Sequence, residues 1–290
     1  MSTERLAKPK WLMMNANFGA GYRRVRSLLH EHGLHSVCQE ASCPNMSECF
    51  ESGTATFLIL GHVCTRGCGF CDILKGKPKM HDLGEPQRLA SAVAKLGLKH
   101  VVITSVTRDD LADGGASIFA ATVRKLREYD PKIQIELLVP DFQGSKESVD
   151  LILEAAPEVF NHNIETVPRL YNKVRPKMGY RRSLSILRYA KGSGKVKLVK
   201  SGIFVGVGEH EDEIKQTMQD IANAGVDILT IGQYLSPSEL HLPVLKYYPP
   251  EDFAKFREWG LTMGYKHVES GPLVRSSYKA SHQSANLIEV

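Results

Sequence analysis

All six cysteines of this 290-residue chain lie in one short stretch near its N-terminus, and none follows Cys71. The last three, Cys64, Cys68 and Cys71, have the spacing CxxxCxxC. Thiolates at this spacing can bind three corners of a cubane iron–sulfur cluster and leave the fourth iron without a cysteine ligand. An open iron can chelate the amino and carboxylate groups of S-adenosylmethionine (SAM), so that an electron from the reduced cluster cleaves the sulfonium. This downstream triplet therefore predicts radical chemistry.

Structural zinc is the first competing interpretation. Clustered thiols in a cytoplasmic chain hold metals more often than they form disulfides. A structural zinc site, however, normally has four closed ligands, often supplied by pairs of the type CxxC. His62 can supply a fourth ligand, but HxCxxxCxxC is not a common zinc pattern. The spacing therefore favours an iron–sulfur cluster over zinc.

A second set of three cysteines lies upstream. Cys38, Cys43 and Cys49 have the spacing CxxxxCxxxxxC. Three further thiolates imply a second cluster, which we call the auxiliary cluster. Spacing alone leaves open a zinc site or a cluster that only relays electrons.

Apolar runs alternate with amphipathic stretches along most of the chain, which predicts repeated βα units. The expected strands cover residues 57–61, 100–106, 133–140, 159–165, 198–208 and 228–235. The expected helices cover residues 85–96, 116–129, 146–155, 182–191, 211–224 and 250–263. We predict an α/β fold, a partial TIM barrel of about six βα units in residues 52–265. Residues 1–51 form an N-terminal extension with the upstream triplet, and residues 266–290 form a C-terminal tail; both are expected to close the barrel mouth.

Polar residues follow several of the expected strands, where a parallel barrel gathers its ligand contacts. Thr107 and Arg108 follow the second strand, and Arg108 is a candidate for pairing with a carboxylate. Asn163, Glu165 and Lys200 are candidates for contacts with SAM or with a substrate lysine. His162 alternates with Asn161 and Asn163, so we expect it to be a packing or outward residue.

Two of these patterns resemble known families. CxxxCxxC after the first strand of a barrel, with Phe70 before the last cysteine, resembles the radical SAM superfamily. CxxxxCxxxxxC ahead of it resembles the lipoyl synthases, and the similarity extends over nearly the whole chain. Further matching stretches are 105–115, 161–167, 200–209, 233–237 and 271–278.

The resemblance implies two 4Fe-4S clusters, with SAM as co-substrate on the downstream one. It also implies that Ser277, the second serine of Arg275-Ser276-Ser277-Tyr278, ligates the fourth iron of the auxiliary cluster. Alkoxide is harder and more basic than thiolate, so protonation can release it from a cluster that is dismantled. The activity implied is insertion of two sulfur atoms, drawn from the auxiliary cluster, at C6 and C8 of a protein-bound octanoyl-lysine.

The resemblance also implies the partners. These are an octanoylated lipoyl carrier (a 2-oxoacid dehydrogenase E2 subunit or the glycine-cleavage H protein), a ferredoxin or flavodoxin as reductant, and an iron–sulfur carrier that rebuilds the auxiliary cluster. Residues 11–26 can form an amphipathic arm whose Arg23, Arg24 and Arg26 dock an acidic lipoyl domain, or simply a solvated helix face. Residues 279–290 are expected to be irregular.

Net charge and the distribution of apolar residues exclude further classes of protein. A net charge of +5, from 37 basic and 32 acidic residues, is too small for a nucleic-acid footprint. The chain has no long apolar run and no apolar stretch at its start, so we expect a cytoplasmic monomer outside the membrane. Three alternative functions remain. A methylthiotransferase usually has a larger N-terminal domain and a C-terminal nucleic-acid module, for which this chain has no room, and biotin synthase does not explain the upstream triplet. The third alternative is a non-enzymatic iron–sulfur scaffold or zinc module.

Overall fold

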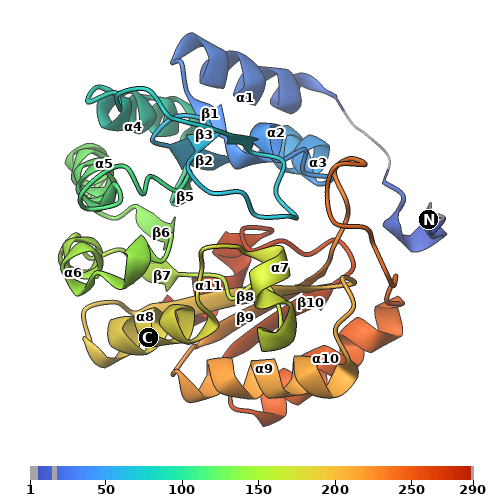
Figure 1. Cartoon of the computed structure of the whole chain (residues 1–290). Coiled ribbons are helices and arrows are strands. Elements are labelled where there is room, and N and C mark those ends of the chain that lie inside the picture. Colours follow the sequence, from blue (N-terminus) through green and yellow to red (C-terminus); the bar gives the residue numbers. More distant parts are fainter. Residues whose placement is uncertain (1–5, 15–17, 289–290) are drawn as a thin grey trace.

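The computed structural model describes residues 6–14 and 18–288 (Figure 1). Its main sheet has the strand order β1-β2-β5-β6-β7-β8-β9-β10. Every neighbouring pair from β2 to β10 is parallel, whereas β1 pairs antiparallel with β2. Within the described residues the two edges are not hydrogen-bonded to each other, so the curved sheet is an open barrel. The strands are β1 His35–Ser36, β2 Thr56–Ile59, β5 His100–Ser105, β6 Gln134–Leu138, β7 Val159–Asn161, β8 Leu198–Val205, β9 Ile228–Gln233 and β10 His267–Gly271.

The predicted α/β partial barrel is confirmed, with one parallel strand more than expected. β10 lies in the region that we assigned to the tail, and its residues pair with β9 from His267 opposite Ile228 to Gly271 opposite Gly232. The chain then turns back across the end of β9. A Cβ atom at Gly232 would overlap the carbonyl oxygen of Val274, so glycine permits this close crossing.

Helices cover the outer face of the sheet (Figure 1). They agree with the predicted ranges to within two residues because their apolar spacing and their ends are both encoded locally. For example, Ser145 Oγ accepts a hydrogen bond from Ser148 N at the start of α6, and Gly97 ends α4 in the left-handed conformation with φ 69°. The helices are α4 Glu85–Leu96, α5 Ala116–Tyr129, α6 Lys146–Glu154, α8 Tyr180–Gly192, α9 Glu211–Asn223 and α10 Pro250–Thr262.

In the described residues of the N-terminal extension, a short 3-10 turn, η1 Lys10–Leu12, precedes the helices α1 Ala20–Glu31, α2 Val37–Glu40 and α3 Met46–Glu51. α1 packs on α3, where Tyr22 N donates a hydrogen bond of 3.1 Å to Glu51 Oε2. The expected arm at 11–26 therefore becomes a turn and a separate, longer helix, and its residues 15–17 lie outside the described residues.

The C-terminal segment corrects one prediction. Residues 279–290 were expected to be irregular, but α11 covers Ala280–Ile288. Ile288 packs against the first residues of β7, β8 and β9, which are Val159, Leu198 and Ile228. α11 therefore covers the barrel at the N-terminal ends of these strands, and only the segment before it can contribute to the mouth. No helix in the described part of the chain is long and apolar enough to cross a membrane.

Candidate active site at the open end of the barrel

The downstream triplet lies on a loop that leaves the end of β2. Cys64 belongs to a short strand, β3 Val63–Cys64, which pairs with β4 Leu74–Lys75. Gly76 N donates to Cys64 O at 3.0 Å, Gly69 N donates to Val174 O at 2.9 Å, and Leu242 N donates to Gly69 O at 3.0 Å. Backbone hydrogen bonds from three separate segments thus hold the loop in place.

Arg66, inside this loop, is a site residue that the sequence analysis missed. Its side chain is buried, and Nε and Nη2 each donate a 2.6 Å hydrogen bond to Asp109. Nη1 donates to Asp141 Oδ1 at 2.7 Å. Burial disfavours the guanidinium charge, but the bonds to Asp109 and the pairing with Asp141 outweigh it, so the pKa of Arg66 lies above its usual value. Arg66 therefore ties the cysteine loop to the loops that follow β5 and β6.

The three thiols of the downstream triplet are free and partly buried. Burial raises the pKa of Cys68 and, together with the neighbouring cysteines of the triplet and Glu165, raises that of Cys71 to about 12. Cys64 and Glu165 also contribute to the rise at Cys68. Arg175 opposes this rise at Cys68. Because thiolate is the ligand form, an iron centre that replaces the thiol proton suits this enclosed site.

The upstream triplet is arranged by two short helices. Cys38 lies in α2, whose first turn is capped by Ser36 Oγ accepting from Gln39 N, and Cys49 lies in α3. Burial raises the pKa of Cys38 to about 11, and burial with the nearby Cys38 and Cys43 raises that of Cys49 to about 12. Cys43 raises the pKa of Cys38, and both raise the pKa of Cys49. The three sulfur atoms therefore lie close together on one side of the extension.

The tail residues named from the family resemblance lie beside this upstream triplet. Thr56 Oγ1 donates a 2.7 Å hydrogen bond to Ser277 Oγ, and the same threonine lies beside Cys38, where it partly opposes the burial that raises the pKa of that thiol. Asn45 Nδ2 donates to Leu273 O at 2.7 Å, and Tyr278 OH donates to Glu48 Oε1 at 3.0 Å. Segments more than 220 residues apart in sequence are thereby joined.

The cysteines provide donor sets of the kind that iron–sulfur clusters bind. All six thiols are free, in two groups of three, with a serine hydroxyl next to one group. Among the described residues no three His, Cys, Asp or Glu side chains converge as ligands of one metal ion. The cysteines of a cubane bind separate irons and need no such convergence. The residues therefore suit three corners of a cluster at each triplet.

The polar mouth residues Asn163 and Glu165 lie next to the downstream triplet and to the tail. Asn163 Nδ2 donates to Glu165 Oε1 at 3.1 Å and to Ser276 Oγ at 2.6 Å, while its buried Oδ1 has no hydrogen-bond partner among the described residues. Glu165 has φ 70°, an unusual value for a residue with a side chain, and its desolvation raises its pKa. Buried Arg175 donates to Asn163 O at 2.5 Å. Unsatisfied and strained groups of this kind are typical of a ligand site.

The remaining candidates have partners within the chain. Arg108 is buried and pairs through Nη2 with Asp110 Oδ2 at 2.8 Å. Lys200 Nζ lies 2.9 Å from Glu136 Oε1 inside the barrel. Phe70 packs against Phe204, with ring centroids 4.9 Å apart. The carbonyl oxygen of Thr107 accepts hydrogen bonds from Thr65 N and Oγ1 at 3.0 and 2.9 Å. Their roles toward SAM stay predictions.

His162 is a packing residue, as expected. It is fully buried, its Nδ1 lies 2.8 Å from Val139 O, and its Nε2 lies 2.9 Å from Ser183 Oγ on α8. It points to the helix layer, while its neighbour Asn161 donates to Glu136 Oε1 at 2.8 Å.

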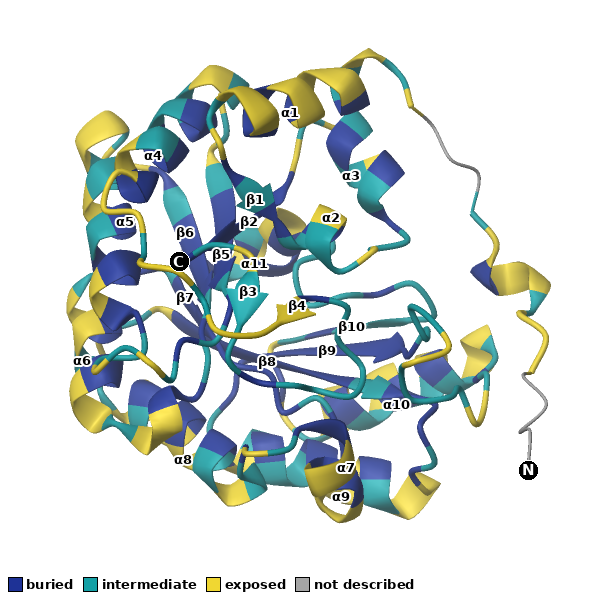
Figure 2. Cartoon of the chain, turned by 45° about the horizontal axis from the view of Figure 1, so that its top comes forward, coloured by how far each residue is buried: buried dark blue, intermediate teal, exposed yellow. Residues whose placement is uncertain are grey.

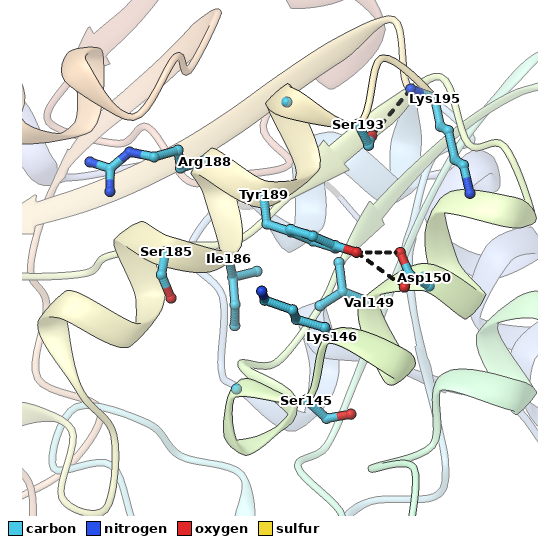
Figure 3. Close-up of a pocket in the computed structure, with 12 residues that line it drawn as sticks. Ser145, Lys146, Val149, Asp150, Ser185, Ile186, Arg188, Tyr189, Ser193 and Lys195 are labelled. Atoms are coloured by element: carbon cyan, nitrogen blue, oxygen red, sulfur yellow. Dashed lines mark hydrogen bonds between the residues drawn. The ribbon is translucent and has the colours of Figure 1, made fainter.

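A groove of about 660 Å³ lies elsewhere, between α6 and α8 on the outside of the barrel (Figure 3). Tyr189 OH donates to Asp150 across it at 2.9 Å, and Lys146 Nζ lies 5.5 Å from the ring centroid of Tyr189. None of the predicted site residues lines this groove. The chemistry-bearing residues instead gather at the open end of the barrel.

Comparison with known proteins gives a consistent result. The family model described as "Radical SAM superfamily" matches residues 58–221. A lipoyl synthase from Rubrobacter xylanophilus is 55% identical over 280 residues, which are 97% of this chain and 87% of that protein. A lipoyl synthase from Flavobacterium johnsoniae is 52% identical, covering 94% of this chain and 95% of the relative. The mitochondrial lipoyl synthase of Nematostella vectensis is 50% identical, with coverage of 95% and 94%.

Solved structures agree on the fold. Streptococcus suis SuiB bound to S-adenosylmethionine superimposes with a TM-score of 0.58 at 12% identity, over 85% of this chain and 54% of that chain. Methylornithine synthase (PylB) has a TM-score of 0.54 at 16% identity, with coverage of 86% and 81%. At such low identity, these two matches support the open barrel alone.

Proposed function

The chain belongs to the lipoyl synthase family of the radical SAM superfamily, and from that membership we propose how its residues divide the work. It is a radical SAM enzyme that forms lipoyl groups. The downstream triplet holds a 4Fe-4S cluster that binds SAM, and the upstream triplet with Ser277 holds a second, auxiliary 4Fe-4S cluster that donates sulfur. The observation that carries this proposal is the hydrogen bond from Thr56 to Ser277, which sets a serine hydroxyl beside Cys38.

The reaction proposed is insertion of two sulfur atoms at C6 and C8 of a protein-bound octanoyl-lysine. These carbons have no acidic proton and no leaving group, so acid–base and nucleophilic catalysis cannot functionalise them. When bound, the clusters and SAM supply radical hydrogen abstraction and sulfur. The protein contributes orientation and exclusion of water.

The mouth residues have separate tasks in this proposal. Asn163 and Glu165, together with Phe70 and Thr107, orient SAM, and the unpaired Asn163 Oδ1 accepts a hydrogen bond from the ligand. Arg108 and Lys200 support the mouth through their carboxylate partners. Ser276 links Asn163 to Ser277, so the two cluster regions share one wall formed by the tail.

We further propose three regions: residues 1–51 with the auxiliary site, residues 52–265 as the barrel, and residues 266–290 as the tail. The octanoylated carrier is an E2 subunit of a 2-oxoacid dehydrogenase or the glycine-cleavage H protein. A ferredoxin or flavodoxin supplies electrons, and an iron–sulfur carrier restores the auxiliary cluster. We propose a monomer that acts in the cytoplasm.

The experiment is anaerobic reconstitution with iron and sulfide, followed by SAM, a reductant and an octanoyl-lysyl peptide, with products measured by mass spectrometry. The unchanged chain should release 5′-deoxyadenosine and add two sulfur atoms to the peptide. A C38A/C43A/C49A variant should bind about half the iron and still cleave SAM, but add no sulfur. A C64A/C68A/C71A variant should keep the auxiliary iron and cleave no SAM.

Two results would count against the proposal. If the chain cleaves SAM and leaves the peptide unchanged, the radical assignment stands and the substrate assignment is wrong. If the upstream variant inserts sulfur as well as the unchanged chain, the upstream triplet is not the sulfur source.

A further inference from the structure

A lysine-rich surface loop lies directly against the downstream triplet. The loop covers residues 74–80, and Lys75, Lys77 and Lys79 are all exposed. It begins with β4, which is coloured as exposed in Figure 2. The side chain of Lys75 passes over the cysteine loop, because its Cδ lies 3.4 Å from where a Cβ of Gly67 would be.

Two hydrogen bonds to the backbone of this lysine loop fix it to the site. At one end Gly76 N donates to the carbonyl oxygen of Cys64 at 3.0 Å. At the other end Arg108 Nη2 donates to Lys79 O at 3.2 Å. The lysines are therefore presented on a loop that is already ordered, which reduces the entropy cost of binding a partner.

The positive charge of the lysine loop is not neutralised within the chain. None of its three lysines forms an ion pair in the described parts of the chain. Three acidic residues nearby are already paired with arginines: Asp82 with Arg88 at 2.8 Å, Asp110 with Arg108 at 2.8 Å and Asp109 with Arg66 at 2.6 Å. The loop thus presents three free cations to solvent.

Apolar side chains flank these charges. Leu74 is 58% exposed and Met80 is 95% exposed. Exposed apolar groups with a charged surround are typical of a surface that binds another protein.

Since the enzyme is proposed to need electrons from a carrier protein, this inference rests on the proposed function and gives that partner a place. We propose that the lysine loop is the docking surface for an acidic one-electron carrier protein with a flavin or iron–sulfur centre. Charge complementarity selects an acidic partner and speeds its encounter. One electron leaves the reduced centre of the carrier and enters the cluster at the downstream triplet, and no atom is transferred.

The contacts favour the electron carrier over the octanoylated substrate protein as the occupant. The lysine loop contacts Cys64, which is part of the downstream triplet, and Arg108, which lies in the loop after β5 at the same end of the barrel. An acyl chain must reach both triplets, whereas an electron needs access to the downstream one alone. The upstream triplet is covered from another side by Leu273 and Tyr278 of the tail.

The test compares K75Q/K77Q/K79Q with R124Q/R181Q/R188Q, which removes the same charge from the exposed faces of α5 and α8. Reduced flavodoxin is mixed anaerobically with each reconstituted protein, and its oxidation is followed by stopped-flow absorbance. The lysine variant should accept electrons about tenfold more slowly at low ionic strength, and the arginine variant at the unchanged rate. The difference should vanish near 1 M salt, where the Debye length is about 3 Å.

Photoreduced 5-deazaflavin, a small reductant that needs no docking surface, separates this inference from the proposed function. With it, all three proteins should cleave SAM equally. If the unchanged protein cleaves no SAM with 5-deazaflavin, the proposed function fails. If it does, and flavodoxin reduces the lysine variant at the unchanged rate, the docking inference alone is wrong. The inference is also wrong if the lysine variant loses binding of an octanoylated lipoyl domain while its reduction by flavodoxin is unaffected.

Discussion

Thr56 Oγ1 donates a 2.7 Å hydrogen bond to Ser277 Oγ, which joins the first residue of β2 to the tail that crosses back over the barrel. Thr56 also lies beside Cys38, where it partly opposes the burial that raises the pKa of that thiol. Thr56 therefore lies next to both a cysteine and a serine of the proposed auxiliary site.

Replacement of this threonine should loosen the serine without unfolding the protein. T56V loses a hydrogen bond with a net worth of about 1 kcal/mol, and T56S retains it. We expect reconstituted T56V to lose its auxiliary iron to a chelator several times faster than T56S, with the downstream cluster unaffected. Iron release measured by absorbance, with Mössbauer spectra of the remaining iron, checks this. Equal release from the two variants would show that Thr56 does not support Ser277.

Arg66 should be a major source of stability for the cysteine loop. Removal of one partner from a buried ion pair typically costs about 3–5 kcal/mol. R66Q leaves buried Asp141 with Arg182 as its remaining cation, so we expect a cost near the lower end of this range. The control is R169Q, which removes a half-exposed, solvent-screened pair with Glu213 and should destabilise the protein much less. The free energies of unfolding in urea give both values. Similar costs for the two variants would mean that burial adds nothing at Arg66.

The free-energy costs of replacing Lys200 and Glu136, which form a buried ion pair, should not be additive. Both side chains are almost fully buried, and burial lowers the pKa of Lys200. K200M alone should cost about 3–5 kcal/mol because it leaves a buried carboxylate without its cation. The double variant E136Q/K200M should recover part of this loss, so the two single costs should not add. Urea unfolding of the four proteins measures the coupling. Additive costs would contradict it.

His162 should make stability depend on pH. Burial lowers its pKa from the usual 6.5 to about 4. The unfolded chain therefore binds a proton at a higher pH than the folded one, so this contribution is fully present above about pH 6.5 and is lost as the pH falls toward 4. Between pH 7 and pH 5 the loss should be about 2 kcal/mol. The control H162Q should lack this component in urea unfolding at the two pH values. An identical pH dependence in both proteins would assign the effect to other groups.

The sequence alone determined the repeated elements and the ligand types. The helices at 85–96 and 116–129 were predicted to the residue, because apolar periodicity and end signals are local properties of the chain. The cysteine spacing likewise indicated two triplets, since three ligands of one cluster can come from one short loop.

The tertiary structure decided which distant residues meet. β10 and α11 were not predicted, because β10 is stabilised by pairing with β9, and α11 by packing on the first residues of β7, β8 and β9, rather than by their own patterns. The pairing of Arg66 with Asp141, and of Thr56 with Ser277, joins segments whose separation in sequence carries no signal in a single chain. These contacts form only when the sheet curves into an open barrel. The curvature brings the ends of the parallel strands and the returning tail to one place.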